Sequence, residues 1–254
     1  MRHQTACATD KGRERLTNED YVLCSDADSL FVVADGVGGH NSGEIASRMA
    51  VEYINAYARK NPIREALGGK ALIDYFTVCL TGINEMILRQ SVTGGRNQGM
   101  ATTLVLAYLS DDGKAYVVNL GDSRAYLIRD EHLLQITEDH TYVNELLKKG
   151  SITRAEAENH PERNMITRAL GTEGKPMPDF YAFDTYPGDR ILLCSDGLYN
   201  EVPGEEIREL AQKSENVDVF VKELVRKANL YGGRDNISVV CAHVMPNKKE
   251  NVNE

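Results

Sequence analysis

Short apolar runs bounded by turn residues predict the strands of this chain. Runs of four to eight residues that are rich in Val, Ile, Leu and Tyr and end at Gly, Asp or Ser are typical of β-strands. Such runs occupy residues 21–25, 30–34, 102–109, 115–120, 125–128, 190–194 and 237–244.

Apolar residues that recur every three or four positions predict helices between these strands. The pattern covers residues 42–59, 71–90, 142–149, 154–159, 204–212 and 218–230. Several predicted strands, such as those within 101–128, follow one another with only turns between them. Because parallel strands need long crossovers, this order favours antiparallel sheets with helices packed outside them, which is an α+β fold.

The same pattern predicts a single domain. No internal repeat and no Pro/Ser-rich linker divides the 254 residues, and 61–70 reads as a loop between two helices. We expect one domain over 1–245. The remaining residues, 246–254, are polar and are expected to be disordered.

Composition and charge narrow the function classes. The net charge of −9 argues against binding to nucleic acid or to an anionic membrane. The five cysteines form no C-x-x-C pair, which favours free thiols in a reducing cytosol. No signal peptide is visible, and no apolar run approaches the length of a membrane span. We therefore expect a cytoplasmic protein that uses neither nucleic acid nor membrane.

Acidic residues stand where several buried strands end. Asp35, Asp122 and Asp196 each adjoin a glycine after an apolar run, and Asp235 precedes a strand. Glu19 and Asp20 precede another. A buried carboxylate is costly unless positive charge meets it, and the chain has no cluster of Lys and Arg large enough to pair each acid. Oxygen-rich sites of this kind suit Mg²⁺ or Mn²⁺.

Each of these signals has a plainer interpretation. An Asp-Gly pair is commonly only a turn, and the sequence around Asp122 could be an ordinary hairpin loop. Several such sites together favour metal binding. The histidines have no ligand-like spacing, which argues against zinc, and His243 is expected to face solvent from a strand.

Eight short motifs are spread along nearly the whole chain. In chain order they are RLTNED, VVADGVGGH, GMATTLVLAYL, VVNLGDSRAYL, ITEDH, ITRALG, LLCSDGLYN and GGRDNISVV. Their order and intervals along nearly the whole chain resemble the PPM family, the type 2C metal-dependent Ser/Thr protein phosphatases, and the wording DGVGGH resembles bacterial members.

The resemblance implies a β-sandwich of two antiparallel sheets flanked by helices (α-β-β-α), with two Mn²⁺ or Mg²⁺ ions at one end. It implies that Asp35 bridges the ions, that the carbonyl of Gly36 binds one of them, and that Asp196 and Asp235 bind the other. It also implies that Glu19 and Asp20 act through metal-bound water, and that Asp122 holds a third ion with Asp196. Asn236 is expected to orient the loop of Asp235.

The resemblance also implies a mechanism in which a metal-activated water attacks the phosphorus directly. Arg15 matches the phosphate-binding arginine, although by itself it could be a solvated surface residue. Some members carry a histidine as general acid where this chain has Val37. His40 does not have that spacing; it could line the substrate entrance or could simply be a surface residue at the start of a helix.

His140 and residues 141–163 match the variable flap near the family's active site, which either contributes to substrate choice or is only an exposed connection. The leading hypothesis is a phosphatase for phosphoserine and phosphothreonine in proteins, acting as a monomer and opposing a Ser/Thr kinase. Its expected partners are phosphorylated proteins, including such a kinase. A catalytically silent sensing relative and a hydrolase of small phosphate esters are the alternatives. The presence of Asp35, Asp196 and Asp235 disfavours the silent relative.

Overall fold

Two antiparallel sheets form the centre of the molecule in the computed structural model, which describes residues 2–38, 42–63, 69–93 and 99–246. Neighbouring strands in both sheets pair antiparallel. The five-stranded sheet has the order β1 (His3–Asp10), β11 (Ile237–Val244), β10 (Arg190–Cys194), β7 (Arg124–Arg129) and β8 (His132–Gln135). The six-stranded sheet has the order β2 (Asp20–Ser25), β3 (Leu30–Val37), β5 (Leu104–Leu109), β6 (Lys114–Leu120) and β9 (Asp179–Asp184), with β4 (Ala101–Thr102) paired to β3.

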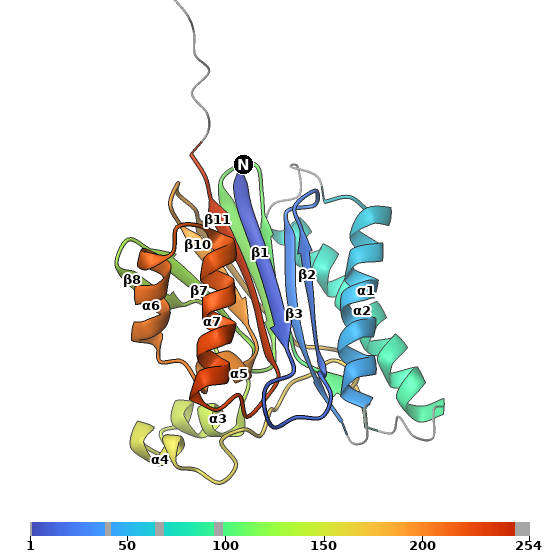
Figure 1. Ribbon diagram of the computed structural model, residues 1–254. Coiled ribbons are helices and arrows are strands. Elements are labelled where there is room, and N and C mark those ends of the chain that lie inside the picture. Colours follow the sequence, from blue (N-terminus) through green and yellow to red (C-terminus); the bar gives the residue numbers. More distant parts are fainter. Residues whose placement is uncertain (1, 39–41, 64–68, 94–98, 247–254) are drawn as a thin grey trace, which may run out of the picture.

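Helices cover the outer face of each sheet (Figure 1). α1 (Ser42–Lys60) and α2 (Lys70–Thr93) pack on the six-stranded sheet. α5 (Asp196–Tyr199), α6 (Gly204–Lys213) and α7 (Val217–Tyr231) pack on the five-stranded sheet. The short helices α3 (Tyr142–Lys148) and α4 (Arg154–Glu158) lie together near one end of the sandwich. This α-β-β-α arrangement confirms the predicted fold class.

The central strands are buried on both faces, which explains their continuous apolar runs. On β3, Phe31 and Val33 point toward the other sheet, whereas Leu30, Val32 and Ala34 point toward the helices. The layer between the sheets takes its other side chains from β5, β6, β7, β10 and β11. Burial on both faces makes these strands rigid supports for the loops at their ends.

Three strands and one helix were missed by the sequence patterns. β1, β8 and β9 are edge strands that lack a long apolar run: β1 (HQTACATD) is largely polar, and β8 (HLLQ) and β9 (DFYAFD) are short and end in polar residues. α5 begins at Asp196, directly after β10, where the sequence suggested only a turn. The predicted helices otherwise agree with the observed ones to within a few residues at each end.

Two further expectations need correction. Among the described residues α2 is long and apolar enough to cross a membrane, with a mean hydropathy of 1.4 over its best window. Its buried face, which includes Leu72, Phe76 and Ile83, packs in the core against α1 and the sheet, as in a core helix of the same composition. His243 is half-buried on β11 and does not face solvent freely, because it lies beside Arg190 and near α6.

Candidate metal centre

The acids predicted to converge lie at one end of the sandwich. Asp20 opens β2 and pairs directly with Asp35 near the end of β3. β10 and β11 are antiparallel neighbours, so the residue that follows β10 lies close to the residue that precedes β11. Asp196 is the second residue after β10 and Asp235 is the second residue before β11, so both lie at this junction. Strand pairing alone therefore brings acids from both sheets to the same end.

Most of the predicted site residues line a pocket of about 270 Å³. Its lining includes the predicted site residues Arg15, Glu19, Asp35, Gly36, Asp122, Asp196 and Asp235, together with Val37 and Asn236. Asp20 is buried behind it and is only 4% exposed. His40 lies outside the described residues.

Each carboxylate of this pocket destabilises the ionised form of its neighbours. Burial, reinforced by the neighbouring acids, raises the pKa of Asp196 to about 7 and that of Asp122 to about 6. Burial also raises the pKa of Asp20 to about 7. For Asp35 burial and then the charge of Asp20 hold the pKa well above its usual range. These acids lack enough positive charge to be ionised together at neutral pH.

Arg15 is the cation that lines this pocket. Its Nη2 donates a hydrogen bond to Asp235 Oδ2 at 2.6 Å, and its side chain is about half-exposed. One guanidinium cannot neutralise five carboxylates. Its place at the rim leaves it available to an anion that enters from solvent.

The donor set fits Mg²⁺ or Mn²⁺ by its chemistry. The candidate ligands are all oxygen atoms, and the buried Oδ1 of Asp20 has no hydrogen-bond partner. Within the described part of the chain, no three Asp, Glu, His or Cys side chains are gathered tightly enough to count as a complete ion site. The pocket therefore matches a divalent cation in charge and donor type, and its side chains would have to move to meet around one.

Two glycines allow the close packing around these acids. A Cβ on Gly36 would lie 2.1 Å from the carbonyl oxygen of Gly43 in α1 and 2.7 Å from that of Glu19. A Cβ on Gly197 would lie 2.0 Å from the carbonyl oxygen of Asn236. Glycine after Asp35 and Asp196 is thus required because the backbones touch, a reason that the sequence did not reveal.

Asn236 ties the loop of Asp235 to a second loop, the β1–β2 connection. Its Oδ1 accepts from Glu19 N at 2.7 Å, and its Nδ2 donates to the carbonyls of Lys11 and Thr17, both at 2.9 Å. Its side chain therefore fixes the β1–β2 connection that carries Arg15. Its own backbone N–H donates to Asp235 Oδ1 at 2.8 Å.

Comparison with known proteins identifies the family. The model of the family described as protein phosphatase 2C matches residues 9–237. The chain belongs to the protein phosphatase 2C family. It is 39% identical over 239 residues to the serine/threonine phosphatase stp of Listeria monocytogenes serotype 4b, with 91% of this chain and 92% of the relative covered.

Solved structures agree with this assignment. The serine/threonine phosphatase PstP/Ppp of Mycobacterium tuberculosis matches with a TM-score of 0.85 and 35% identity, covering 96% of this chain and 99% of that one. A structure of the catalytic domain of PstP in complex with two manganese ions matches with a TM-score of 0.83 and 34% identity, covering 96% and 99%. The chain is thus a metal-dependent serine/threonine protein phosphatase.

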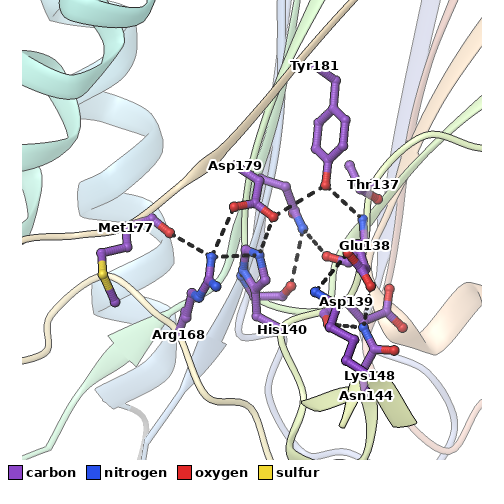
Figure 2. Close-up of polar contacts among 12 residues, drawn as sticks. Thr137, Glu138, Asp139, His140, Asn144, Lys148, Arg168, Met177, Asp179 and Tyr181 are labelled. Atoms are coloured by element: carbon purple, nitrogen blue, oxygen red, sulfur yellow. Dashed lines mark hydrogen bonds and ion pairs between the residues drawn. The ribbon is translucent and has the colours of Figure 1, made fainter. Parts of the chain in front are cut away.

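In this phosphatase His140 contacts the loop of Asp122 through Gly121, and Figure 2 shows its ring beside Arg168 and Asp179. The ring is buried, and its Nδ1 accepts from Gly121 N at 3.1 Å, so Nε2 carries the proton and donates to Asp179 Oδ2 at 3.1 Å. Arg168 pairs with the other oxygen of Asp179 at 3.0 Å. Burial lowers the pKa of His140. His140 is therefore a buried support and not part of an exposed flap.

A wider groove of about 560 Å³ adjoins the acidic pocket and shares Asp122, Asp196 and Asp235 with it. Residues of the predicted flap, 141–163, form part of its wall through Thr141, Val143, Ala157, Glu158 and Arg163. The flap therefore lies beside the candidate centre, where a bound protein would meet it.

Arg124, Asp139 and Tyr199 also line this groove and were not predicted as site residues. Arg124 forms an ion pair with Asp139 at 2.6 Å and stacks on the ring of Tyr199, 3.5 Å from its centroid. The hydroxyl of Tyr199 donates to the carbonyl of Asp122 at 3.0 Å. Arg124 and Asp139 belong to the motifs GDSR and ITEDH, so the signal was present, but nothing in the sequence shows that they pair.

Proposed function

We propose that this phosphatase hydrolyses phosphoserine and phosphothreonine in proteins at a centre of two Mn²⁺ or Mg²⁺ ions, opposing a Ser/Thr kinase. The observation that carries the proposal is the pocket in which Asp35, Asp196 and Asp235 lie together with Arg15 at its rim. These four residues come from four separate segments of the chain, and mutual repulsion among the acids would be relieved by divalent cations.

The proposal gives each acid a role in holding the ions. Asp35 would bridge the pair, the Gly36 carbonyl would bind one ion, and Asp196 and Asp235 would bind the other. Glu19 and Asp20 would act through water, and Asp122 with Asp196 would hold a third, weaker ion. When bound, the ions would supply positive charge for the phosphoryl oxygens and an activated water as the attacking group.

Arg15 would bind and orient the phosphoryl group. Its guanidinium lies at the pocket rim with about half of its surface exposed, and its planar fork suits two phosphate oxygens at once. Asp235 holds the guanidinium in place from one side through the hydrogen bond described above. Binding of phosphate by Arg15 would fix the phosphorus in front of the acids.

Val37 offers no proton to the leaving alcohol. It lines the pocket and is 43% exposed, so it forms an apolar part of the wall where a substrate side chain would pass. The proton must come from another donor. His40 remains a candidate for the substrate entrance and lies outside the described residues.

We also propose the setting in which the activity operates. The phosphatase would be a cytoplasmic monomer with one catalytic domain over residues 1–245 and a polar tail at 246–254. Its substrates would be phosphorylated proteins, among them a Ser/Thr kinase. The groove beside residues 141–163 would contact the protein part of these substrates.

The test is phosphate release from a phosphothreonine protein or peptide, measured with Mn²⁺ and with chelator. We expect turnover that requires Mn²⁺ and that favours the phosphoprotein over an aryl phosphate. Turnover of the aryl phosphate alone would point to a hydrolase of small esters. Binding of the phosphopeptide without turnover in Mn²⁺ or Mg²⁺ would point to a silent sensing relative.

Kinetics of Arg15→Ala test the phosphate-binding role. We expect KM for the phosphopeptide to rise about tenfold or more, because a charge-assisted bidentate contact is lost. Arg13→Ala is the matched control, since Arg13 lies exposed on the same loop outside the pocket lining. Equal KM values for wild type and Arg15→Ala would show that Arg15 is a solvated surface residue.

A further inference from the structure

The two sheets meet at one edge through strands β1 and β2. β1 is the edge strand of the five-stranded sheet and β2 is the edge strand of the six-stranded sheet. Figure 1 shows the two strands running close together. The hydroxyl of Thr5 donates to Asp26 in the turn after β2, and His3 Nε2 lies 3.9 Å from the same carboxylate. Side chains from different sheets are therefore in contact along this edge.

Cys7 on β1 and Cys24 on β2 face each other across this edge. Cys7 pairs with Val240 and Cys24 pairs with Phe31, and both partners belong to the layer between the sheets. Directly paired residues point to the same face of a sheet, so both thiols point into the gap between the two sheets. Cys7 is exposed at the open side of the gap and Cys24 is half-buried behind it.

The other three cysteines differ from this pair. Cys79, Cys194 and Cys241 are buried, and burial raises the pKa of each thiol to about 12, which keeps them unreactive. A hydrogen bond between the thiols of Cys24 and Cys7 lowers the pKa of Cys7 to about 7, against the opposing effects of burial and Asp26. The same bond raises the pKa of Cys24. Cys7 is therefore the thiol of this pair that loses its proton more readily.

We propose that Cys7 and Cys24 are a redox modification site, at which a reversible disulfide links the two sheets and closes the loop that carries Arg15, Glu19 and Asp20. The thiols are exposed on one side, face each other, and belong to strands that already touch. In a reducing cytosol such a bond forms only under oxidising conditions, so it would act as a reversible state of the protein.

The chemistry balances with a low-molecular-weight disulfide as the oxidant. The Cys7 thiolate attacks one sulfur of that disulfide and releases one small thiolate, leaving a mixed disulfide on Cys7. Cys24 loses its proton to water and attacks the Cys7 sulfur, which releases the second small thiolate. Two protein thiols are oxidised, one small disulfide is reduced to two thiols, and an excess of dithiol reverses both steps.

The bond would act on the connection between β1 and β2. This connection joins Asp10 to Asp20 and is held near both of its ends by Asn236. A covalent link between Cys7 and Cys24 restricts both of its ends and so restricts the positions available to Arg15. The effect on Arg15 rests on the proposed function, whereas formation of the disulfide does not.

Mass spectrometry tests the bond. The full-length, Mn²⁺-loaded protein is incubated with oxidised glutathione, freed of the reagent and digested without reduction. We expect an intact mass lower by two hydrogens, and a cross-linked peptide pair containing Cys7 and Cys24. Cys7→Ser and Cys24→Ser should lose this product, and Cys79→Ser should retain it. Recovery of both thiols unlinked, or a disulfide that involves Cys79, Cys194 or Cys241 instead, would overturn the proposal.

Stability and kinetics test the consequence. The oxidised protein should have a Tm about 5 °C or more above that of the reduced protein, because a loop of this length is closed in the unfolded chain. We expect KM for a phosphopeptide to change at least twofold on oxidation, and to be insensitive to oxidation in Cys24→Ser. A cross-linked protein whose KM and Tm equal those of the reduced form would refute any control of the loop.

These results remain distinguishable from a failure of the proposed function. If Arg15→Ala leaves KM unchanged, then Arg15 does not bind phosphate, and the mass and Tm results still decide whether the disulfide forms. If Arg15→Ala raises KM while the cross-linked peptide is absent, the phosphatase mechanism stands and the redox site is excluded.

Discussion

At the scale of single residues, the centre is governed by repulsion among carboxylates. Asp196 illustrates the point, because burial first, and then Asp122 and Asp235, raise its pKa to about 7. In the absence of cations such a residue destabilises the fold in its ionised form. A site of this kind gives up stability for the ability to bind divalent cations.

The substitution Asp196→Asn separates the effect of this carboxylate on cation binding from its effect on the stability of the fold. We expect Mn²⁺-dependent turnover to fall by more than about 100-fold, since even residues that merely support metal ligands cost about 10–100-fold when changed. In chelator the Tm should stay equal or rise, because one member of a repelling group is neutralised while the contact with Asn200 can persist. Phosphate release and thermal unfolding are the measurements.

Asp218→Asn, an exposed position on α7, is the control for this change and should affect neither quantity. A Tm in chelator clearly below that of wild type would show that the Asp196 charge is stabilised by the protein itself, contrary to the account above.

At the scale of elements, the central strands are buried on both faces and support the loops at their ends. Contacts with residues far away in the sequence set the positions of these loops. The β1–β2 connection is the best example, because Asn236, more than 200 residues away in sequence, accepts from Glu19 and donates to Lys11 and Thr17. The junction of β3 with α1 is another, since the backbones at Gly36 and Gly43 are in direct contact.

Asn236→Ala should release the β1–β2 connection. Three part-buried hydrogen bonds to backbone groups are lost, so we expect the free energy of unfolding to fall by about 2–4 kcal/mol. KM for the phosphopeptide should rise as well, because Arg15 is no longer held at the rim. Urea unfolding and steady-state kinetics provide the two readouts.

Asn61→Ala serves as the matched change at an exposed asparagine whose side chain donates to the carbonyl of Tyr57 in the adjoining helix α1. Unfolding and KM that are identical in Asn236→Ala and wild type would mean that the loop is held by other contacts.

Gly36→Ala should disrupt the junction of β3 and α1. The new Cβ would lie 2.1 Å from the Gly43 carbonyl, which is backbone and cannot rotate away. We expect a loss of about 1–3 kcal/mol in the free energy of unfolding and a marked loss of Mn²⁺-dependent activity, because Asp35 shifts with the strand.

Gly204→Ala is the matched control for that variant. Its Cβ would approach only the flexible side chain of Leu133, at 3.3 Å, so stability and activity should both be retained. A fully active, stable Gly36→Ala protein would contradict the observed contact between the two backbones.

At the scale of the whole molecule, the acidic end of the sandwich links global stability to pH. The folded, metal-free protein holds protons on Asp20 and Asp196 up to about pH 7, whereas the ordinary pKa of Asp is 3.8. Between these values the folded state binds more protons than the unfolded state. The stability that these groups contribute is therefore complete below pH 3.8 and is lost as pH rises through about 7.

We accordingly expect the Tm of the chelated protein to fall by about 5 °C or more between pH 5 and pH 8, as measured by thermal scans in buffers of constant ionic strength. Saturating Mn²⁺ should flatten this slope, because bound cations stabilise the ionised carboxylates. Asp196→Asn should also reduce it. A Tm in chelator that rises over the same range would show that these acids are ionised in the folded state.

The order of apolar runs along the chain predicted the class of fold, and the acids at the ends of these runs predicted the candidate metal site. Asp35, Asp122, Asp196 and Asp235 were evident because each follows or precedes a strongly apolar strand, and strands buried on both faces leave clear runs in the sequence. The adjacent glycines were visible for the same reason. Antiparallel sheets flanked by helices could be predicted from the order of these runs.

The residues that hold the loops of the candidate metal site became apparent only in the folded structure. Edge strand β1 lacks an apolar run, and its contact with β2, which brings Cys7 to Cys24, depends on the closure of two different sheets. The roles of Asn236 and His140 arise from hydrogen bonds to backbone groups elsewhere in the chain. Local patterns record burial and turns, whereas such contacts form only when distant segments pack together.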